Sequence, residues 1–129
     1  MARFNYININ PNLEDIGDCV VRAIALANPN LDYEQVEEKL FYTAQLLDCP
    51  ERCVCCYSFL LDAVFGYQQV DCYGLSVYEF CQEYPSGVFL VRMDGHLTCV
   101  IDGEIWDTWN CGDEIVTNAW SVSRETIEY

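Results

Sequence analysis

The second half of the chain constrains the fold most, because short apolar runs alternate with strong turn signals. Residues 88–93 and 96–101 are apolar runs of strand length, and Asp94-Gly95 separates them. The pair Asp102-Gly103 then separates the second run from residues 104–109. Asp-Gly between two apolar runs is among the strongest short-range signals for a β-hairpin. We therefore expect three consecutive antiparallel strands in this region.

The first half has a different pattern, with apolar residues at helical spacing. The expected elements are helices over residues 19–28, 33–48, 53–65 and 77–84, with further strands over 67–72 and 115–122. Asp32 and Gln35 have the spacing of a capping box, and Ser76 is placed to cap the fourth helix. Helices followed by a mostly antiparallel sheet predict the α+β class. At 129 residues the chain is expected to form one domain, 1–129.

Charge and hydropathy limit the classes of function. Twenty-one acidic residues against six basic ones give a formal net charge of −15. This charge argues against binding to nucleic acids and to anionic membranes, both of which need basic side chains. It is consistent with simple solubility or with a basic protein partner. No apolar run approaches the roughly 20 residues of a membrane span, and Met1–Asn5 has no apolar signal-peptide core, so we expect a bacterial or host cytoplasm.

Nine cysteines are an odd number, and without an export signal we expect them to be reduced and mostly buried. The densest group, residues 49–56, contains one Cys-x-x-Cys pair, Cys53 and Cys56. A structural zinc site normally needs a second pair or histidines. We therefore expect both thiols to face the core and predict no metal site. A thiol or zinc function for this segment is the weaker alternative.

Cys19 differs from the other cysteines because it begins an apolar helical segment, with Asp18 as the candidate N-cap. The unpaired N–H groups at a helix N-terminus stabilise negative charge and favour a thiolate. The negative charge of Asp18 acts in the opposite direction and is expected to raise the pKa of the thiol somewhat. Cys19 is therefore a candidate nucleophile.

The hairpin register brings the only histidine towards an acidic residue. If Asp102-Gly103 is a two-residue turn, Thr98 faces Asp107 and His96 faces Trp109, and all four side chains share one face of the sheet. His96 and Asp107 are then diagonal neighbours, about 7 Å apart at the backbone. Asn110 is the other candidate to orient the histidine, but alternation places it on the opposite face. A bulge near Trp109 would reverse that preference.

These residues also have a purely structural interpretation. A lone histidine at the start of a strand is commonly a polar residue at a sheet edge. The role of Asp107 could be no more than a hydrogen bond to Thr98 or Thr108. Spacing alone does not decide between this interpretation and a catalytic pair.

Two segments resemble signatures of small papain-like cysteine peptidase-fold proteins of bacteriophages and bacteria. Residues 17–25 resemble the opening of these proteins, a Gly-Asp-Cys stretch followed by an Arg-Ala pair. Residues 95–103 and 105–109 resemble their second signature, a Gly-His strand that turns at Asp-Gly and returns through an aromatic-Asp-Thr-Trp stretch. The similarity runs roughly from residue 12 to residue 120. It implies a papain-like fold with N-terminal helices and a mostly antiparallel sheet.

The resemblance also implies a function, a cysteine hydrolase that cleaves a peptide or amide bond without a cofactor. Cys19 would be the nucleophile, His96 the general base and acid, and Asp107 the residue that orients the imidazole. The backbone N–H of Cys19 would contribute to the oxyanion hole. Papain-like enzymes often add a glutamine side chain a few residues earlier, and here Asn12 is the nearest amide.

Trp109 is the candidate substrate-binding residue, because it shares a face with His96. The main alternative is an inactive papain-fold protein of phage or bacterial origin, whose acidic surface engages a basic host protein.

Overall fold

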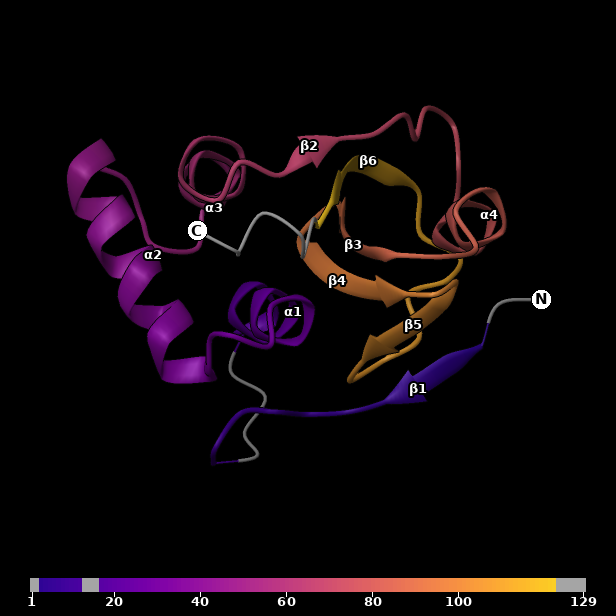
Figure 1. Ribbon diagram of the computed structural model, residues 1–129, viewed down its shortest axis with the longest axis horizontal. Helices are drawn as coiled ribbons and strands as arrows, with labels where there is room; N and C mark the ends of the chain where they lie inside the picture. The colour runs from indigo at the N-terminus through magenta and orange to yellow at the C-terminus, as the bar shows by residue number, and fades with distance from the viewer. Residues whose placement is uncertain (1–2, 13–16, 123–129) are drawn as a thin grey trace.

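A computed structural model of the protein describes residues 3–12 and 17–122, whereas the predicted domain, 1–129, extends beyond these ranges. The chain forms a six-stranded mixed sheet with strand order β1-β5-β4-β3-β6-β2 (Figure 1). Its elements in chain order are β1 (Phe4–Tyr6), α1 (Cys19–Ala27), α2 (Tyr33–Leu47), α3 (Val54–Phe59), the π-helical turn η1 (Leu60–Val64), β2 (Gln68–Gln69), α4 (Val77–Glu83), β3 (Val88–Met93), β4 (His96–Ile101), β5 (Glu104–Asp107) and β6 (Val116–Ser121). The α+β class is confirmed.

The predicted β3-β4-β5 meander is present. Strands β3 and β4 pair from Val88↔Ile101 to Met93↔His96, and Ile101 lies opposite Glu104 across the second turn. Asp102 and Gly103 both have positive φ, 50° and 74°, as the tight turns favoured in hairpins require. Strand β5 ends at Asp107, two residues earlier than predicted.

The sheet differs from the expectation at its two edges. Strand β1 was not predicted, and it pairs in parallel with β5, from Phe4↔Ile105 to Tyr6↔Asp107. Its three residues are too few to show an alternating pattern. At the other edge, β2 contains only two residues and pairs with β6. A parallel strand at one edge makes the sheet mixed.

Helices α2 and α4 begin at the predicted caps. Asp32 and Gln35 form a complete capping box at the start of α2, and Ser76 and Glu79 form one at the start of α4. Helix α3 continues directly into η1, so the predicted helix over residues 53–65 is present with a widened last turn.

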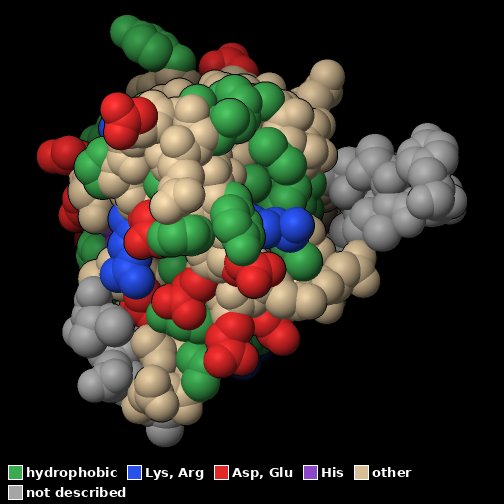
Figure 2. All heavy atoms as spheres, turned by 90° about the vertical axis from the view of Figure 1, so that its left-hand side faces the viewer, with side chains coloured by type: hydrophobic (Ala, Val, Ile, Leu, Met, Phe, Trp, Pro, Cys, Tyr) green, Lys and Arg blue, Asp and Glu red, His purple; other side chains and the backbone are tan. Residues whose placement is uncertain are grey.

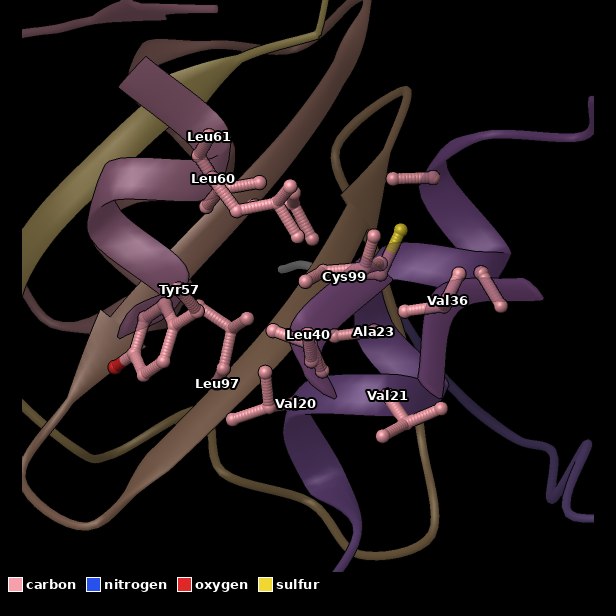
Figure 3. Packing of buried hydrophobic residues seen from close by; sticks show 14 of the residues in the cluster. Val20, Val21, Ala23, Val36, Leu40, Tyr57, Leu60, Leu61, Leu97 and Cys99 are labelled. Carbon is pink, nitrogen blue, oxygen red and sulfur yellow. The ribbon is translucent and has the colours of Figure 1, made fainter. Parts of the chain in front are cut away.

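Helix α1 is the central helix of the fold. It lies between the sheet and α2, while α4 lies apart from these helices beside β3 and β6 (Figure 1). Val20 and Val21 of α1 pack with Leu40 of α2 and with Leu97 and Cys99 of β4 (Figure 3). Each fully buried aliphatic side chain contributes about 1.5–3 kcal/mol relative to an exposed one. This packing fixes α1 against β4, and so it places the N-terminus of α1 beside the start of that strand.

The face formed mainly by α2 carries acidic and hydrophobic side chains next to one another, with few basic ones (Figure 2). Phe41, Tyr42 and Leu46 are its large exposed hydrophobic residues. In the described ranges, none of the helices has both the length and the apolar character needed to cross a membrane.

Candidate active site

The structure places the three predicted site residues at the ends of adjacent elements. Cys19 is the first residue of α1, His96 the first of β4, and Asp107 the last of β5. His96 Nε2 and Asp107 Oδ2 are 2.6 Å apart, and both side chains are buried. The register of the hairpin therefore brings His96 and Asp107 into a direct hydrogen bond.

Asp107 is held in the ionised form by its partners. Burial alone would raise the pKa of its carboxyl group, but the hydrogen bond from His96 and the His96 charge outweigh burial and lower the pKa. The backbone N–H of Thr108 adds a hydrogen bond to Oδ1 at 2.7 Å. A buried carboxylate with these donors can fix one orientation of the imidazole ring.

Cys19 contacts the same histidine. Burial alone would raise the pKa of its thiol, but a hydrogen bond with His96 and one from the Leu97 backbone N–H lower it below the ordinary value. For His96, burial acts to lower the pKa, but hydrogen bonds with Asp107, Cys111 and Cys19 raise it to about 11. Both shifts favour the charged forms, a thiolate beside an imidazolium.

Residues after β5 surround the histidine. The rings of Trp109 and His96 are 4.8 Å apart between centroids, although 43% of Trp109 is exposed. Cys111 is buried, and its Sγ lies 4.0 Å from Asp107 Oδ2. Asn110 is exposed and donates its side-chain amide to the Tyr78 hydroxyl. Asp107, rather than Asn110, is thus the partner of His96.

A buried polar network at the start of α1 was missed by the sequence analysis. Asp18 occupies the N-cap position, but its side chain does not cap the helix. It pairs instead with Arg22 one turn later and accepts hydrogen bonds from Tyr33 (2.6 Å) and Asn10 (2.8 Å). The (i, i+4) spacing of Asp18 and Arg22 was the available signal, whereas no local pattern indicates Tyr33 or Asn10.

Arg22 links this network to Asp107. Its second guanidinium nitrogen lies 4.0 Å from Asp107 Oδ1 and donates to Thr108 Oγ1 at 3.3 Å. A single buried guanidinium therefore connects α1, which carries Cys19, to the end of β5, which carries Asp107. The Asp18 charge is paired with Arg22, and the net shift of the Cys19 pKa is downwards, in the opposite direction to the effect expected of Asp18.

Cys19 and Asn12, the two expected oxyanion donors, differ in their distance from the start of α1. Cys19 begins α1, so its backbone N–H belongs to the unpaired first turn of the helix. Asn12 is exposed in a turn, and its backbone N–H donates to Asn10 Oδ1 at 2.8 Å. Among the described contacts of Asn12, none reaches Cys19, so its role stays a prediction.

A hollow of about 170 Å³ opens at Cys19 and His96. It is lined by Gly17, Cys19, Val20, Arg52, Val54, Tyr57, Gly95 and His96. The loop before α3 therefore forms one wall, a contribution that the sequence analysis missed. A larger open depression of about 710 Å³ lies at the end of α2 and contains neither Cys19 nor His96.

Two groups of side chains in the described ranges are close enough to hold a metal ion. One consists of Cys49, Cys53 and Cys55, and the other of His96, Asp107 and Cys111. In the second group a metal would have to replace the proton between His96 and Asp107. The first group has no such competing bond to an acidic side chain.

Comparisons with known proteins add no assignment. Neither models of protein families, nor curated protein sequences, nor solved structures gave a match to this chain.

Proposed function

We propose that the protein is a papain-like cysteine hydrolase that cleaves a peptide or amide bond. The observation that carries this proposal is the position of His96, which hydrogen-bonds to the Asp107 carboxylate and lines the same hollow as Cys19, whose thiol pKa it lowers. A nucleophile, a base and an orienting acid in contact are the arrangement needed for acyl transfer.

Each side chain has a defined part in the acylation step. Because Asp107 bonds to Nε2 of His96, the other ring nitrogen, Nδ1, serves Cys19. The Cys19 thiolate attacks the carbonyl carbon, a C–S bond forms, and the carbonyl electrons move to the oxygen. Protonated His96 then gives its proton to the leaving amine as the C–N bond breaks. The products are a free amine and an acyl group on Cys19.

Hydrolysis of the acyl group reverses these roles. Neutral His96 takes a proton from water, the water oxygen attacks the acyl carbon, and the C–S bond breaks. The Cys19 thiolate and the His96 imidazolium are restored, and a carboxylic acid leaves. The negative charge of Asp107 stabilises the imidazolium in both half-reactions.

The developing oxyanion needs donors near the start of α1. The Cys19 backbone N–H is the proposed first donor. Asn12 is the proposed second donor, and its part would require a change in the exposed turn where it lies. Trp109, which is 43% exposed and whose ring lies tilted against that of His96, is the proposed contact for a substrate side chain.

An activated ester tests the proposal without knowledge of the natural substrate. Wild-type protein mixed with p-nitrophenyl acetate is expected to release a burst of p-nitrophenol and to acquire one acetyl group on Cys19, mapped by mass spectrometry. Slower steady release then reports hydrolysis of the acyl group. Cys19→Ala is expected to lose the burst.

Cys55→Ala is the matched control, because Cys55 is an exposed thiol outside the site, and this variant should keep the burst. Acetylation spread over several cysteines, with Cys19 not preferred, would contradict the proposal.

A second candidate is an acidic binding protein on the same fold. It is favoured by the exposed face of α2, where Glu34, Glu37 and Glu38 are exposed along the same helix as Phe41 and Tyr42. A basic protein partner would suit this surface and the net charge of −15. Under this candidate, Cys19→Ala keeps partner binding while the pair Glu37→Lys and Glu38→Lys loses it. If the protein is a hydrolase, Cys19→Ala loses ester cleavage, whereas the variant with Glu37→Lys and Glu38→Lys keeps it.

A further inference from the structure

The segment from the end of α2 to the first turn of α3 gathers three thiols within seven residues. The Sγ atoms of Cys49, Cys53 and Cys55 all lie within 4.8 Å of one another. Those of Cys53 and Cys55 are 2.7 Å apart, and all three cysteines are free thiols. The expectation that Cys53 and Cys56 face the core is confirmed for Cys56, which is buried, and holds in part for Cys53, which packs against the core but is only partly buried.

Cys56 takes a different position from these three. It is fully buried, and its Sγ donates a hydrogen bond to the Leu40 carbonyl oxygen at 3.5 Å. Its backbone N–H donates to Cys53 Sγ at 3.4 Å. Cys56 thus contacts Cys53 through its backbone, but its own thiol is not part of the group.

The pKa values of Cys53 and Cys49 are shifted in opposite directions. Burial acts to raise the pKa of Cys53, but hydrogen bonds from Cys55 and from the Cys56 backbone N–H lower it below the ordinary value. Burial and hydrogen bonds with Cys55 and Cys53 raise the pKa of Cys49 to about 12.

We propose that Cys49, Cys53 and Cys55 bind one Zn²⁺ ion, with the fourth coordination position open to solvent. A Zn–S distance of about 2.3 Å in a tetrahedral site places thiolate sulfurs roughly 3.8 Å apart. The Sγ atoms of Cys53 and Cys55 lie 2.7 Å apart, and no two of the three lie more than 4.8 Å apart, so small side-chain rotations would bring all three to this spacing. Binding releases one proton from each thiol, and the loaded site carries a single negative charge.

The surroundings favour a cation at this position. Asp48 and Glu51 are exposed on either side of Cys49, and the whole chain has a net charge of −15. Thiolate ligands select soft ions such as Zn²⁺ over Mg²⁺ or Ca²⁺. The site is open enough for entry, because Cys55 is exposed.

The ion would stabilise a loop that also shapes the hollow at Cys19. Arg52 lies between two of the thiols, and it donates to the Gly17 carbonyl oxygen at 3.1 Å. Arg52 and Val54 both line the hollow. The zinc site does not depend on the proposed hydrolase activity, since its residues are separate from Cys19, His96 and Asp107.

Titration of the fully reduced protein with Co²⁺ tests the site by absorption. We expect one equivalent to give thiolate-to-cobalt charge-transfer bands and the visible bands of a tetrahedral site, and Zn²⁺ to displace it. Cys55→Ala should weaken binding by at least about tenfold, and because this side chain is exposed, the variant should fold normally. Cys55→His, which restores a ligand, should recover the visible bands.

Two variants separate this site from the neighbouring groups. Cys56→Ser should keep one equivalent of Co²⁺, because Cys56 lies outside the proposed ligand set. Cys111→Ala should also keep it. The proposal is overturned if the reduced protein gives no tetrahedral cobalt spectrum, if Cys55→Ala binds as tightly as wild type, or if only Cys111→Ala abolishes binding.

Discussion

His96 is the residue on which the contacts of the proposed site converge. It is the only histidine in the chain. It hydrogen-bonds with Asp107, lies near Cys19 and Cys111, and its ring is 4.8 Å from that of Trp109. Burial opposes its protonation, but its partners raise its pKa to about 11. The state of this one ring therefore determines whether Cys19 is paired with a charged or a neutral neighbour.

The protonation of His96 can be read directly by NMR, because no other imidazole contributes signals. We expect the ¹⁵N shifts of the ring to show a protonated imidazole at about pH 8, above the ordinary range of histidine. Asp107→Asn removes the carboxylate that favours the charged form, so it should lower the pKa of His96 by about 1–3. A ring that titrates near pH 6.5 in both proteins would contradict the arrangement.

The same shift predicts how folding stability depends on pH. The folded pKa of His96, about 11, lies above the ordinary 6.5, so its contribution is complete below about pH 6.5 and is lost as pH rises towards 11. The free energy of unfolding, measured with urea, should fall between about pH 6 and about pH 9. This fall should be larger in wild type than in His96→Gln. Equal losses would mean that His96 does not gain its proton from the fold.

The start of α1 is held in place by contacts with residues far from it in the sequence. The Asp18 carboxylate is fully buried and satisfied by Arg22, Tyr33 and Asn10. Arg22 then reaches Thr108 and Asp107 at the end of β5. This network joins the start of α1 to the end of β5, and so it helps to position Cys19 relative to the His96–Asp107 pair.

Breaking the network at Arg22 should be costly. Arg22→Met leaves the Asp18 carboxylate buried without its charge partner and should destabilise the protein by about 3–5 kcal/mol in urea unfolding. Asp18→Asn combined with Arg22→Met removes both charges and should cost less than the single Arg22→Met change. If the double variant is as unstable as the sum of the single variants, the two residues do not act as a pair.

The elements that the sequence predicted are those with strong local signals. The register of β3, β4 and β5 follows from apolar runs and Asp-Gly turns, and it also predicted that His96 and Asp107 would meet. Strand β1 gave no signal, because its pairing with β5 joins residues about a hundred positions apart. The wall formed by Arg52 and Val54 was likewise hidden, since it depends on where the start of α3 lies relative to the start of α1.

The whole molecule carries a strong excess of negative charge, which acts against its compact state. Fifteen more acidic than basic side chains repel one another most strongly at low ionic strength. The described ion pairs, Arg22 with Asp18 and Asp107, and His96 with Asp107, are buried. Salt therefore screens the surface repulsion more than it weakens these pairs.

Added salt should stabilise the protein. Raising NaCl from about 10 mM to about 500 mM is expected to increase Tm by roughly 3–6 °C, which corresponds to about 1 kcal/mol for a domain of this size. Differential scanning calorimetry measures this change. Charge reversal at the exposed Glu37 and Glu38, which lowers the net negative charge, should reduce the effect of salt, and a fall in Tm with salt would show that exposed ion pairs dominate.

The reactivity of Cys19 in mildly acidic solution tests the central claim, a thiolate activated by His96, most directly. Reduced protein is treated with a limiting amount of iodoacetamide near pH 6, where ordinary thiols are almost fully protonated, and the modified residues are mapped by mass spectrometry. Cys19 should be alkylated at least about tenfold faster than the exposed Cys55, and His96→Ala or His96→Gln should abolish this preference. Alkylation of Cys19 that is no faster than that of Cys55, or that is unchanged without His96, would contradict the account.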